Sequence, residues 1–213
     1  MYQYFEKKVM TKGEDITNLY DKGYVFTRVG VGEMHKIQGI RIDINQFVLT
    51  SENRRILRKI SDIEYFVKPL PYTDYTYIIQ KMGTDFYKSK FGSGIFSAYK
   101  IKELFTKEDN LNFNYVFEFK KGKKSVGYAI SFMNRDIIHY SYPFYDLSLN
   151  RKDIGLGMMT RVLEYAKENS KKYVYLGSIN KKEALYKLQF KGAEWFDGIK
   201  WSNDLEILKL NIR

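Results

Sequence analysis

The chain has 213 residues, of which 44% are hydrophobic and 17% aromatic, so it can bury the core of one large domain or two small ones. It contains no cysteine, which excludes disulfides, thiolate metal sites and a cysteine nucleophile. With two histidines, His35 and His139, we expect no structural metal site. The net charge of +11 indicates either a solvated surface or an anionic partner such as RNA, a nucleotide or a membrane surface.

The sequence also indicates where the protein is found and how many domains it has. The N-terminal sequence MYQYFEKKVM has no apolar run typical of a secretion signal. No apolar segment approaches the roughly 20 residues that span a bilayer. We therefore expect a cytoplasmic protein that does not enter a membrane. Three prolines and no Ser/Pro-rich linker predict one domain over residues 1–213, with a small N-terminal lobe over residues 1–50.

Alternating residues predict strands early in the chain. Residues 24–32 alternate and end in glycines, which is typical of a strand and a turn. Residues 39–50 alternate again, with Ile40, Ile42 and Ile44 on one face.

The segment SENRRILRKI predicts a short amphipathic helix. Thr50 or Ser51 can cap it, and Glu52 lies in its first turn. A basic face of this kind is usually only solvated, but several cations within two turns favour contacts with phosphates. The candidate nucleic-acid contacts on this face are Arg54, Arg55, Arg58 and Lys59.

The middle of the chain predicts two more helices. Residues 72–87 follow a break at Pro69 and Pro71 and have a helical pattern. Residues 97–105 follow a glycine loop and predict a second, shorter helix.

The second half of the chain predicts strands and helices in alternation. We expect a three-stranded meander over 113–142 with turns at 121–123 and 134–136, a helix over 157–168, a strand over 173–177, a helix over 180–190 capped by Asn180, and strands over 192–201 and 205–210. This order predicts the α/β class, with helices packed on a mixed sheet.

Two glycines precede the helix predicted over 157–168. Gly155 and Gly157 would leave backbone N–H groups free at the helix N-terminus, where the helix dipole favours anions such as phosphate. Glycine would be needed there for a close approach or for its dihedral angles. The third glycine of a dinucleotide fingerprint and the Lys-Ser/Thr of a P-loop are absent. A tight turn without a ligand is the alternative interpretation.

Two motifs in the second half resemble those of the GNAT acyltransferase superfamily. RKDIGLG is similar to its Q/R-x-x-G-x-G/A pyrophosphate loop, with Lys152 at the first position, and NKKEALYKLQF is similar to its later Asn and Leu-Tyr signature. The resemblance implies a GNAT-like, mostly antiparallel mixed sheet flanked by helices. It implies that Tyr186 protonates the thiolate of coenzyme A as it leaves; the alternative is that Tyr186 is a packing residue. The donor-binding positions that it implies are Lys152, Ile154, Gly155, Leu156, Gly157 and Asn180.

A second resemblance covers residues 25–200. GIRIDINQFVLTSENRRILRK, YKSKFGSG and YPFYDLSLNRKDIGLG…YVYLG resemble arginyl- and leucyl-tRNA–protein transferases. This resemblance implies an aminoacyl-tRNA donor and a tRNA contact for the basic helix. Two departures stand out: the cysteine cluster of that family is absent, and Leu147 replaces the proline that usually follows Phe-Tyr-Asp.

Both resemblances imply attack of a neutral amine on an activated acyl carbon, which a base assists. Asp146 and Glu118 are the acidic candidates; Asp146 is favoured because it precedes the glycine loop, although it could simply cap a turn. Tyr140, Tyr142 and Tyr145 are candidates to line the cleft, although aromatic residues in strands more often lie in the core.

Three functions remain open from the sequence. The favoured function is an N-acyltransferase that moves an aminoacyl group from tRNA to an amine, in particular a protein N-terminus. The first alternative is an N-acetyltransferase that uses acetyl-CoA as donor and a protein or small amine as acceptor. The second is a non-catalytic RNA-binding module. None of the three implies a covalently bound cofactor.

Overall fold

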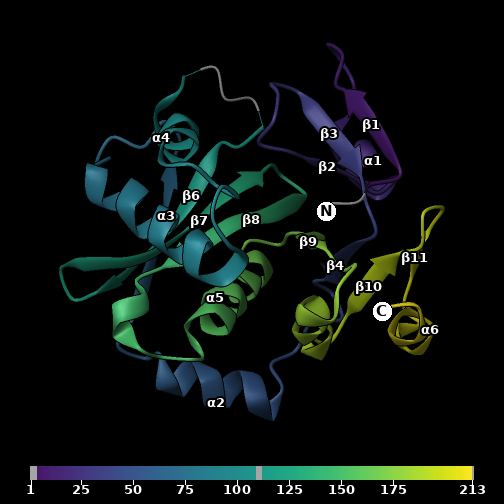
Figure 1. Cartoon of the computed structure of the whole chain (residues 1–213). Helices are drawn as coiled ribbons and strands as arrows, with labels where there is room; N and C mark the ends of the chain where they lie inside the picture. Colours follow the sequence, from purple (N-terminus) through teal and green to yellow (C-terminus); the bar gives the residue numbers. More distant parts are fainter. Residues whose placement is uncertain (1–3, 109–111, 213) are drawn as a thin grey trace.

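The computed structural model describes residues 4–108 and 112–212, so residues 1–3 of the predicted N-terminal lobe lie outside the described part of the chain. Figure 1 shows the arrangement of the elements. In chain order they are β1 (Glu6–Val9), α1 (Ile16–Asp21), β2 (Tyr24–Phe26), β3 (Glu33–Lys36), β4 (Gly39–Asp43), α2 (Ser51–Lys59), β5 (Glu64–Pro69), α3 (Tyr77–Phe91), α4 (Ala98–Thr106), β6 (Tyr115–Lys121), β7 (Lys124–Met133), β8 (Ile137–Tyr145), the 3-10 helix η1 (Leu147–Leu149), α5 (Ile154–Glu168), β9 (Tyr173–Ser178), the 3-10 helix η2 (Lys182–Gln189), β10 (Ala193–Phe196), β11 (Trp201–Ser202) and α6 (Leu205–Asn211).

The described strands form one large and one small sheet. The large sheet has the order β11-β10-β4-β9-β8-β7-β6-β5, and the small sheet has the order β1-β3-β2. Within the large sheet only the pair β8 and β9 is parallel; its other neighbouring strands are antiparallel. The predicted mixed, mostly antiparallel sheet flanked by helices is confirmed.

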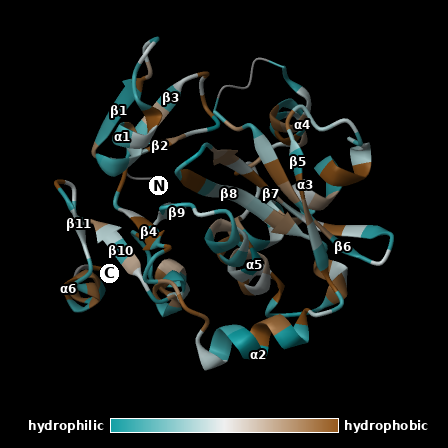
Figure 2. Ribbon diagram, turned by 180° about the vertical axis from the view of Figure 1, so that it is seen from behind, coloured by the Kyte–Doolittle hydropathy of each residue, from teal (hydrophilic) through white to brown (hydrophobic). Residues whose placement is uncertain are grey.

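Two hydrophobic layers cover the two faces of the large sheet, because successive strand residues point to opposite sides. On β6, Phe117 packs in the layer that contains α2 and α5, whereas Val116 packs in the layer that contains α1, α3 and α4. Figure 2 shows α2 at the edge of the molecule below α5, with hydrophobic and hydrophilic residues side by side on it.

Polar contacts join α1 to the large sheet. The Arg41 guanidinium on β4 bonds Asp21 at the end of α1 at 2.8 Å and Glu194 on β10 at 2.7 Å. It also lies over the Tyr173 ring, 3.7 Å from the centroid. The Trp201 indole donates to the Asp21 carbonyl at 2.9 Å. These contacts hold α1, which leads into β2, against β4, β9 and β11 of the large sheet, and the site described below opens at β9.

The predicted basic helix and the central meander are confirmed. Thr50 caps α2 in a reciprocal capping box with Asn53. Ser97 caps α4 by accepting from the backbone of Lys100. The strands β6, β7 and β8 form the meander with turns at the predicted positions.

Four predicted boundaries or element types were wrong. The chain over 205–210 is helical rather than extended, because Asp204 caps α6 by accepting from two backbone N–H groups. Helix α3 begins at Tyr77 rather than at residue 72, because the Tyr72 N–H bonds the Phe105 carbonyl instead of entering a helix. Helix α5 begins at Ile154, which places both glycines inside its first turn. The 180–190 segment is a 3-10 helix that starts after Lys181, so Asn180 does not cap it.

Within the described residues, no helix combines the length and apolar character that crossing a lipid bilayer requires.

Candidate functional site

The parallel pair β8 and β9 separates after three residues. Their pairing runs from Ile137 with Tyr173 to His139 with Tyr175. Beyond this point the two strands diverge, and a cavity of about 290 Å³ opens between them. Its lining comes from β8, β9, the small sheet, α3, α5 and η2: Val25, Phe26, Ile37, Phe91, His139, Tyr140, Ser141, Tyr142, Pro143, Met159, Leu176, Gly177, Ser178, Tyr186 and Lys187. We call this cavity the strand cleft.

A β-bulge in β8 lies at the point of divergence. The β7–β8 register shifts so that Ser141 and Tyr142 stand opposite the one residue between Ala129 and Ser131. Tyr142 has a φ of 40°, a left-handed conformation that is strained for a bulky side chain. Its hydroxyl accepts from the Arg28 backbone N–H at 3.1 Å, which helps to hold it. Because a bulge bends a strand and redirects its side chains, it accounts for the opening of the strand cleft.

A chain of three hydrogen-bonded side chains reaches the strand cleft from α1. The Tyr20 hydroxyl lies 2.9 Å from His139 Nδ1, and the Ser141 Oγ lies 2.7 Å from His139 Nε2. All three side chains are buried. Burial, with a smaller contribution from the charge of Lys187, lowers the pKa of His139 to about 3, so its imidazole is neutral at ordinary pH.

Two tyrosines in the strand cleft differ in their surroundings. The Tyr140 hydroxyl is buried and has no hydrogen-bond partner within the described residues. A buried hydroxyl is costly without a partner, so this atom is suited to a bond with a bound substrate. Tyr186 stands at the edge of the cavity, where 47% of its surface is exposed. Burial of its hydroxyl raises the pKa of Tyr186, and the neighbouring Tyr145 adds a smaller contribution in the same direction.

Lys187 supplies the charge of the strand cleft. Its ammonium group donates to the carbonyls of Leu176 and Ser178 at 2.8 and 2.9 Å, on either side of Gly177. An ammonium group has three donors, so one remains for a ligand. Burial lowers the pKa of Lys187 to about 8. No Asp or Glu is among the lining residues, so Lys187 is suited to a negatively charged substrate group.

The two predicted acidic residues do not line the strand cleft. Asp146 accepts from the Ser148 backbone and pairs with Lys124 at 2.7 Å, which matches the alternative prediction of a turn cap. Glu118 is buried within β6, where its Oε1 accepts from Ser125. Tyr145, another predicted cleft residue, packs against α3 instead, whereas Tyr140 and Tyr142 do line the cavity.

The predicted anion-binding loop opens on a different cavity, of about 470 Å³, beside α2. Lys152 lines it, together with Lys59 and Asp153. The Asp153 carboxylate lies at the start of α5 and pairs with Lys59 at 2.7 Å. An internal carboxylate therefore already balances part of the positive charge at this helix end.

The other loop positions have mainly backbone roles. The Gly157 N–H is bonded to the Asp153 carbonyl at 2.8 Å, so it is not free for an anion. The side chain of Ile154 is buried and that of Leu156 is half-buried. Gly155 packs against Tyr145. Asn180 is half-buried between β9 and η2 and lines neither cavity.

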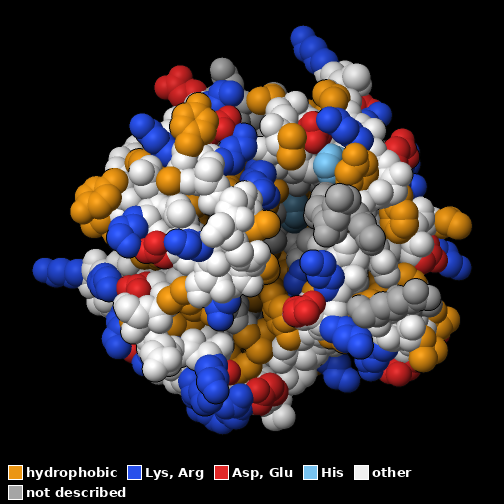
Figure 3. Space-filling model, viewed as in Figure 1, with side chains coloured by type: hydrophobic (Ala, Val, Ile, Leu, Met, Phe, Trp, Pro, Cys, Tyr) orange, Lys and Arg blue, Asp and Glu red, His pale blue; other side chains and the backbone are white. Residues whose placement is uncertain are grey.

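The basic face of α2 is only partly neutralised. Arg55 pairs with Glu52, and Arg54 donates to the Leu49 carbonyl. Arg58 is exposed and has no side-chain partner within the described residues. Figure 3 shows Lys and Arg side chains gathered over α2 at the lower edge of this face and hydrophobic side chains along a furrow at its centre.

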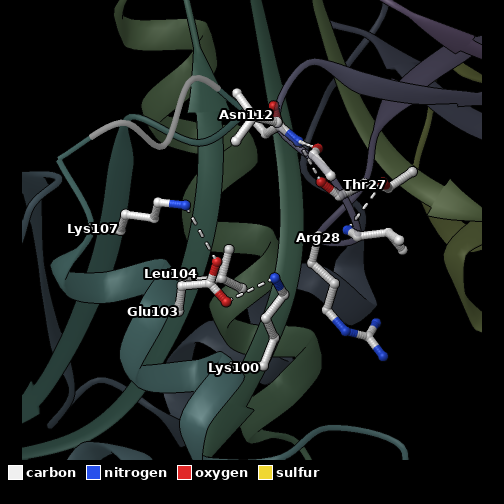
Figure 4. Close-up of a pocket in the computed structure, with 10 residues that line it drawn as sticks. Thr27, Arg28, Lys100, Glu103, Leu104, Lys107 and Asn112 are labelled. Carbon is white, nitrogen blue, oxygen red and sulfur yellow. Dashed lines mark hydrogen bonds and ion pairs between the residues drawn. The ribbon is translucent and has the colours of Figure 1, made fainter.

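A third cavity, of about 270 Å³, lies between α4 and the loop after β2 (Figure 4). Glu103 points to Lys100 and Lys107 and pairs with both. Asn112 donates to the Thr27 carbonyl at 2.7 Å. The charges of these residues are thus used in contacts within the fold, and we assign no chemistry to this cavity.

Comparison with known proteins identifies the relatives of the chain. Residues 93–197, which include β8, β9 and η2, match the family of the arginine-tRNA-protein transferase C terminus. An aspartate/glutamate leucyltransferase from Granulibacter bethesdensis is 26% identical over 92% of this chain and 78% of its own length. The chain is similar to the aminoacyl-tRNA–protein transferases. The predicted acyltransferase class and the predicted resemblance to this branch are confirmed.

Two solved structures share the fold. The C-terminal domain (DUF2156) of a protein named as a lysylphosphatidylglycerol synthetase from Agrobacterium fabrum has a TM-score of 0.51 over 76% of this chain at 11% identity. L-PGS from Bacillus licheniformis has a TM-score of 0.50 over 76% of this chain at 16% identity. The chain spans about half the length of each, 51% and 49%. These neighbours show the fold of this chain, a mixed, mostly antiparallel sheet flanked by helices.

Within the aminoacyl-tRNA–protein transferase relationship, the cysteine cluster that the family resemblance implies does not fit this chain. The sequence has no cysteine to supply thiolate ligands. No group of three or more His, Asp and Glu residues in the described part of the chain could hold a metal ion. We therefore derive no step through a metal or cluster.

The most polar residues of the strand cleft were not predicted from the sequence. His139, Ser141 and Lys187 carry no motif, and His139 reads as one more residue of an apolar strand. Ser141 and His139 are two residues apart and therefore lie on the same face of β8. This spacing is a weak indication that their side chains lie together. The bulge that opens the cleft leaves no mark in the sequence pattern.

Proposed function

We propose that the protein transfers an apolar aminoacyl group, leucyl in the first instance, from tRNA to the α-amino group of a protein that begins with Asp or Glu. The aminoacyl-tRNA donor follows from the transferase relationship. The acidic acceptor and the leucyl group are those of the aspartate/glutamate leucyltransferase from Granulibacter.

The lining of the strand cleft carries the proposal. Its walls are mostly apolar or aromatic, and Lys187 is its one charged side chain. An arginyl group would require a carboxylate partner, and none lines the cavity. The free donor of Lys187 matches the carboxylate of an acidic N-terminal residue. The cavity therefore favours an apolar donor group and an anionic acceptor.

We assign the tRNA contact to the basic face of α2. Phosphate contacts position nucleic acids without reading sequence, and exposed arginines supply them well. Arg54, Arg58 and Lys152 are the principal candidates, because Arg55 and Lys59 already have acidic partners.

The test is a transfer assay with three labelled donors: leucyl-tRNA, arginyl-tRNA and acetyl-CoA. The acceptors are peptides that begin with Asp, Glu, Asn or Lys, each with an N-acetylated control. We expect label from leucyl-tRNA in the free Asp and Glu peptides. Label from arginyl-tRNA alone would refute the apolar donor, and label from acetyl-CoA alone would make the protein an acetyltransferase. Binding of tRNA without transfer from any donor would support the RNA-binding module.

A matched pair of variants tests the acceptor site. Lys187→Met removes the cleft charge and should reduce transfer to the Asp peptide far more than to the Asn peptide. Lys171→Met is the control, because Lys171 also donates to two backbone carbonyls, those of Asn134 and Arg135, but lies outside the strand cleft. Equal preference for Asp and Asn peptides in the wild type would contradict the assignment.

A further inference from the structure

We propose that Ser141 is the catalytic proton shuttle of aminoacyl transfer and that His139 and Tyr20 are the residues that position it. The inference rests on the proposed function, because the aminoacyl ester and the acceptor amine are the groups that exchange the proton. Ser141 lies in the β8 bulge, at the point where β8 leaves β9, and it lines the strand cleft.

The hydrogen bonds of the three side chains assign their protons. A neutral imidazole carries one N–H. The Tyr20 hydroxyl already accepts from the Phe26 N–H at 3.3 Å. If His139 Nδ1 carried the proton, this hydroxyl would accept twice, and its own buried proton would have no acceptor within the described residues. Tyr20 therefore donates to Nδ1, and the Nε2–H of His139 donates to Ser141 Oγ.

This arrangement leaves the Ser141 hydroxyl able both to donate and to accept. Its oxygen accepts one bond from His139, which leaves one lone pair and its own proton. No other partner of Ser141 Oγ exists within the described residues, and the side chain lines the strand cleft. Two hydrogen-bonding directions therefore remain for substrate atoms.

The transfer step balances through this hydroxyl. The amine nitrogen attacks the ester carbonyl carbon, the C–N bond forms, and the amine proton passes to Ser141 Oγ. The Ser141 proton passes to the ribose oxygen as the C–O bond of the ester breaks. The products are the amide and the free tRNA hydroxyl, and Ser141, His139 and Tyr20 end in the state in which they began.

The shuttle matches the apolar character of the strand cleft. Attack makes the amine nitrogen positive and departure makes the ribose oxygen negative, and both charges are costly in a cavity with few polar groups. Moving one proton through Ser141 removes both charges together. The neutral imidazole of His139 fixes the hydroxyl without taking up a charge itself.

The first measurement is the ¹⁵N chemical shift of the imidazole of His139. The chain has two histidines, so His35→Gln leaves a single imidazole to observe. We expect a neutral ring with its proton on Nε2 at pH 7. A charged ring, or a proton on Nδ1, would overturn the assignment whether or not the protein shows transfer activity.

The second measurement is single-turnover transfer from leucyl-tRNA to an Asp peptide. We expect Ser141→Ala to reduce the rate by about 10² to 10⁴, the usual range for loss of acid–base assistance, with an unchanged Kd for tRNA. The wild-type rate should show a solvent deuterium effect with two protons in flight. Ser131→Ala is the matched control, because Ser131 is also buried, in the adjacent strand, and its Oγ donates to the Ala129 carbonyl instead of lining the strand cleft.

The positioning role of His139 is tested by rescue. His139→Gln keeps an amide N–H near the place of Nε2 and should transfer at least tenfold faster than His139→Ala. Wild-type rates in Ser141→Ala would overturn the shuttle and leave the proposed function standing. Absence of transfer by the wild type from any charged tRNA would overturn the proposed function, and the shuttle with it.

Discussion

Gly157 in α5 lies directly against Ile60, the residue that ends α2. A Cβ atom on Gly157 would stand 2.5 Å from Ile60 Cδ1 and 3.0 Å from Cγ1. The φ of Gly157 is not positive, so its backbone conformation does not require glycine. This glycine therefore serves the packing of α2 on α5, and through it the position of the basic face.

Gly157→Ala should destabilise the protein. Overpacking of a buried contact costs about 1–3 kcal/mol, against which the better helix propensity of Ala returns up to about 1 kcal/mol. We expect a lower free energy of unfolding in urea and partial restoration by Ile60→Val, which removes Cδ1. Gly155→Ala is the control, because its Cβ would stand 3.3 Å from a Tyr145 ring atom. Additive effects of Gly157→Ala and Ile60→Val would contradict the contact.

The helices and strands were predicted correctly where the hydrophobic periodicity and the capping residues of a segment indicate the same element that the fold requires. The basic helix, the meander and the strand after α5 follow from periodicity and capping, and the structure has them. The 205–210 helix was missed because Asp204, its cap, lies just outside a segment that reads as a strand. The two glycines before the predicted helix were interpreted as an anion-binding loop. In the structure Gly157 packs directly against Ile60, which is almost 100 residues away in the chain.

The candidate site was predictable only in part, for a physical reason. Tyr186, Tyr140 and Tyr142 were named from the sequence and line the strand cleft. Ser141, His139 and Lys187 meet there only because β8 bulges and parts from β9, a tertiary event without a sequence signature. Asp146 precedes the loop as predicted, but its own hydrogen bonds direct it to a turn and to Lys124.

Protonation of His139 should weaken the fold in acid. Its pKa is about 3 in the folded chain and 6.5 for an ordinary histidine, mainly through burial. Below pH 6.5 the unfolded chain binds the extra proton, so stability falls as the pH drops from 6.5 towards 3. The slope for one proton is about 1.4 kcal/mol per pH unit.

His139→Gln should remove the loss of stability in acid that protonation of His139 causes. The difference in unfolding free energy between wild type and variant, measured in urea from pH 7.5 to 4.5, should be constant above pH 6.5. It should move in favour of the variant by about 2.7 kcal/mol at the lowest pH, two pH units below 6.5 at about 1.4 kcal/mol per unit. Carboxylates titrate alike in both proteins and cancel in the difference. Parallel curves over the whole range would show that His139 is not buried as a neutral ring.

Lys187 should make acceptor preference depend on pH. Its pKa of about 8 means that the ammonium group loses its charge above that value. We expect the ratio of kcat/KM for an Asp peptide over an Asn peptide to fall about tenfold as the pH rises from 7 to 9, since a hydrogen bond to a charged group contributes about 1.5–3 kcal/mol. The pKa of the acceptor amine is measured for each peptide and the ratio is taken for the neutral amines, because the Asp carboxylate raises the pKa of its own amine. A pH-independent ratio would remove Lys187 from the acceptor site.

Arg58 should contribute to the salt dependence of tRNA binding. If it contacts a phosphate, Arg58→Ala should make the slope of log K against log salt concentration shallower by about 0.7–0.9. The measurement is fluorescence anisotropy of labelled tRNA at several salt concentrations. Lys209→Ala is the control, because Lys209 lies on α6 and pairs with Glu206. Equal slopes for wild type and Arg58→Ala would place the tRNA on another surface.

Tyr140 and Tyr186, two of the three tyrosines that line the strand cleft, should contribute differently to catalysis. The Tyr140 hydroxyl is buried without a partner within the described residues, so it can donate to the oxygen that becomes negative when the amine attacks. We expect Tyr140→Phe to reduce kcat for transfer from leucyl-tRNA by about 10²-fold, the usual cost of one such donor. Tyr186→Phe should change it by less than about threefold. Tyr186 is half-exposed, and its raised pKa makes it a poorer acid than an ordinary tyrosine.

The comparison of Tyr140→Phe with Tyr186→Phe also distinguishes a thioester donor from an aminoacyl-tRNA donor. The GNAT resemblance gives Tyr186 the task of protonating a thiolate, which arises only when the donor is a thioester such as acetyl-CoA. With an ester of tRNA, the leaving oxygen receives its proton from Ser141 instead. The transfer rates of Tyr140→Phe and Tyr186→Phe should be measured at saturating donor. The near-ultraviolet circular dichroism spectrum checks that both variants are folded. A loss in Tyr186→Phe as large as that in Ser141→Ala would move the leaving-group proton from Ser141 to Tyr186.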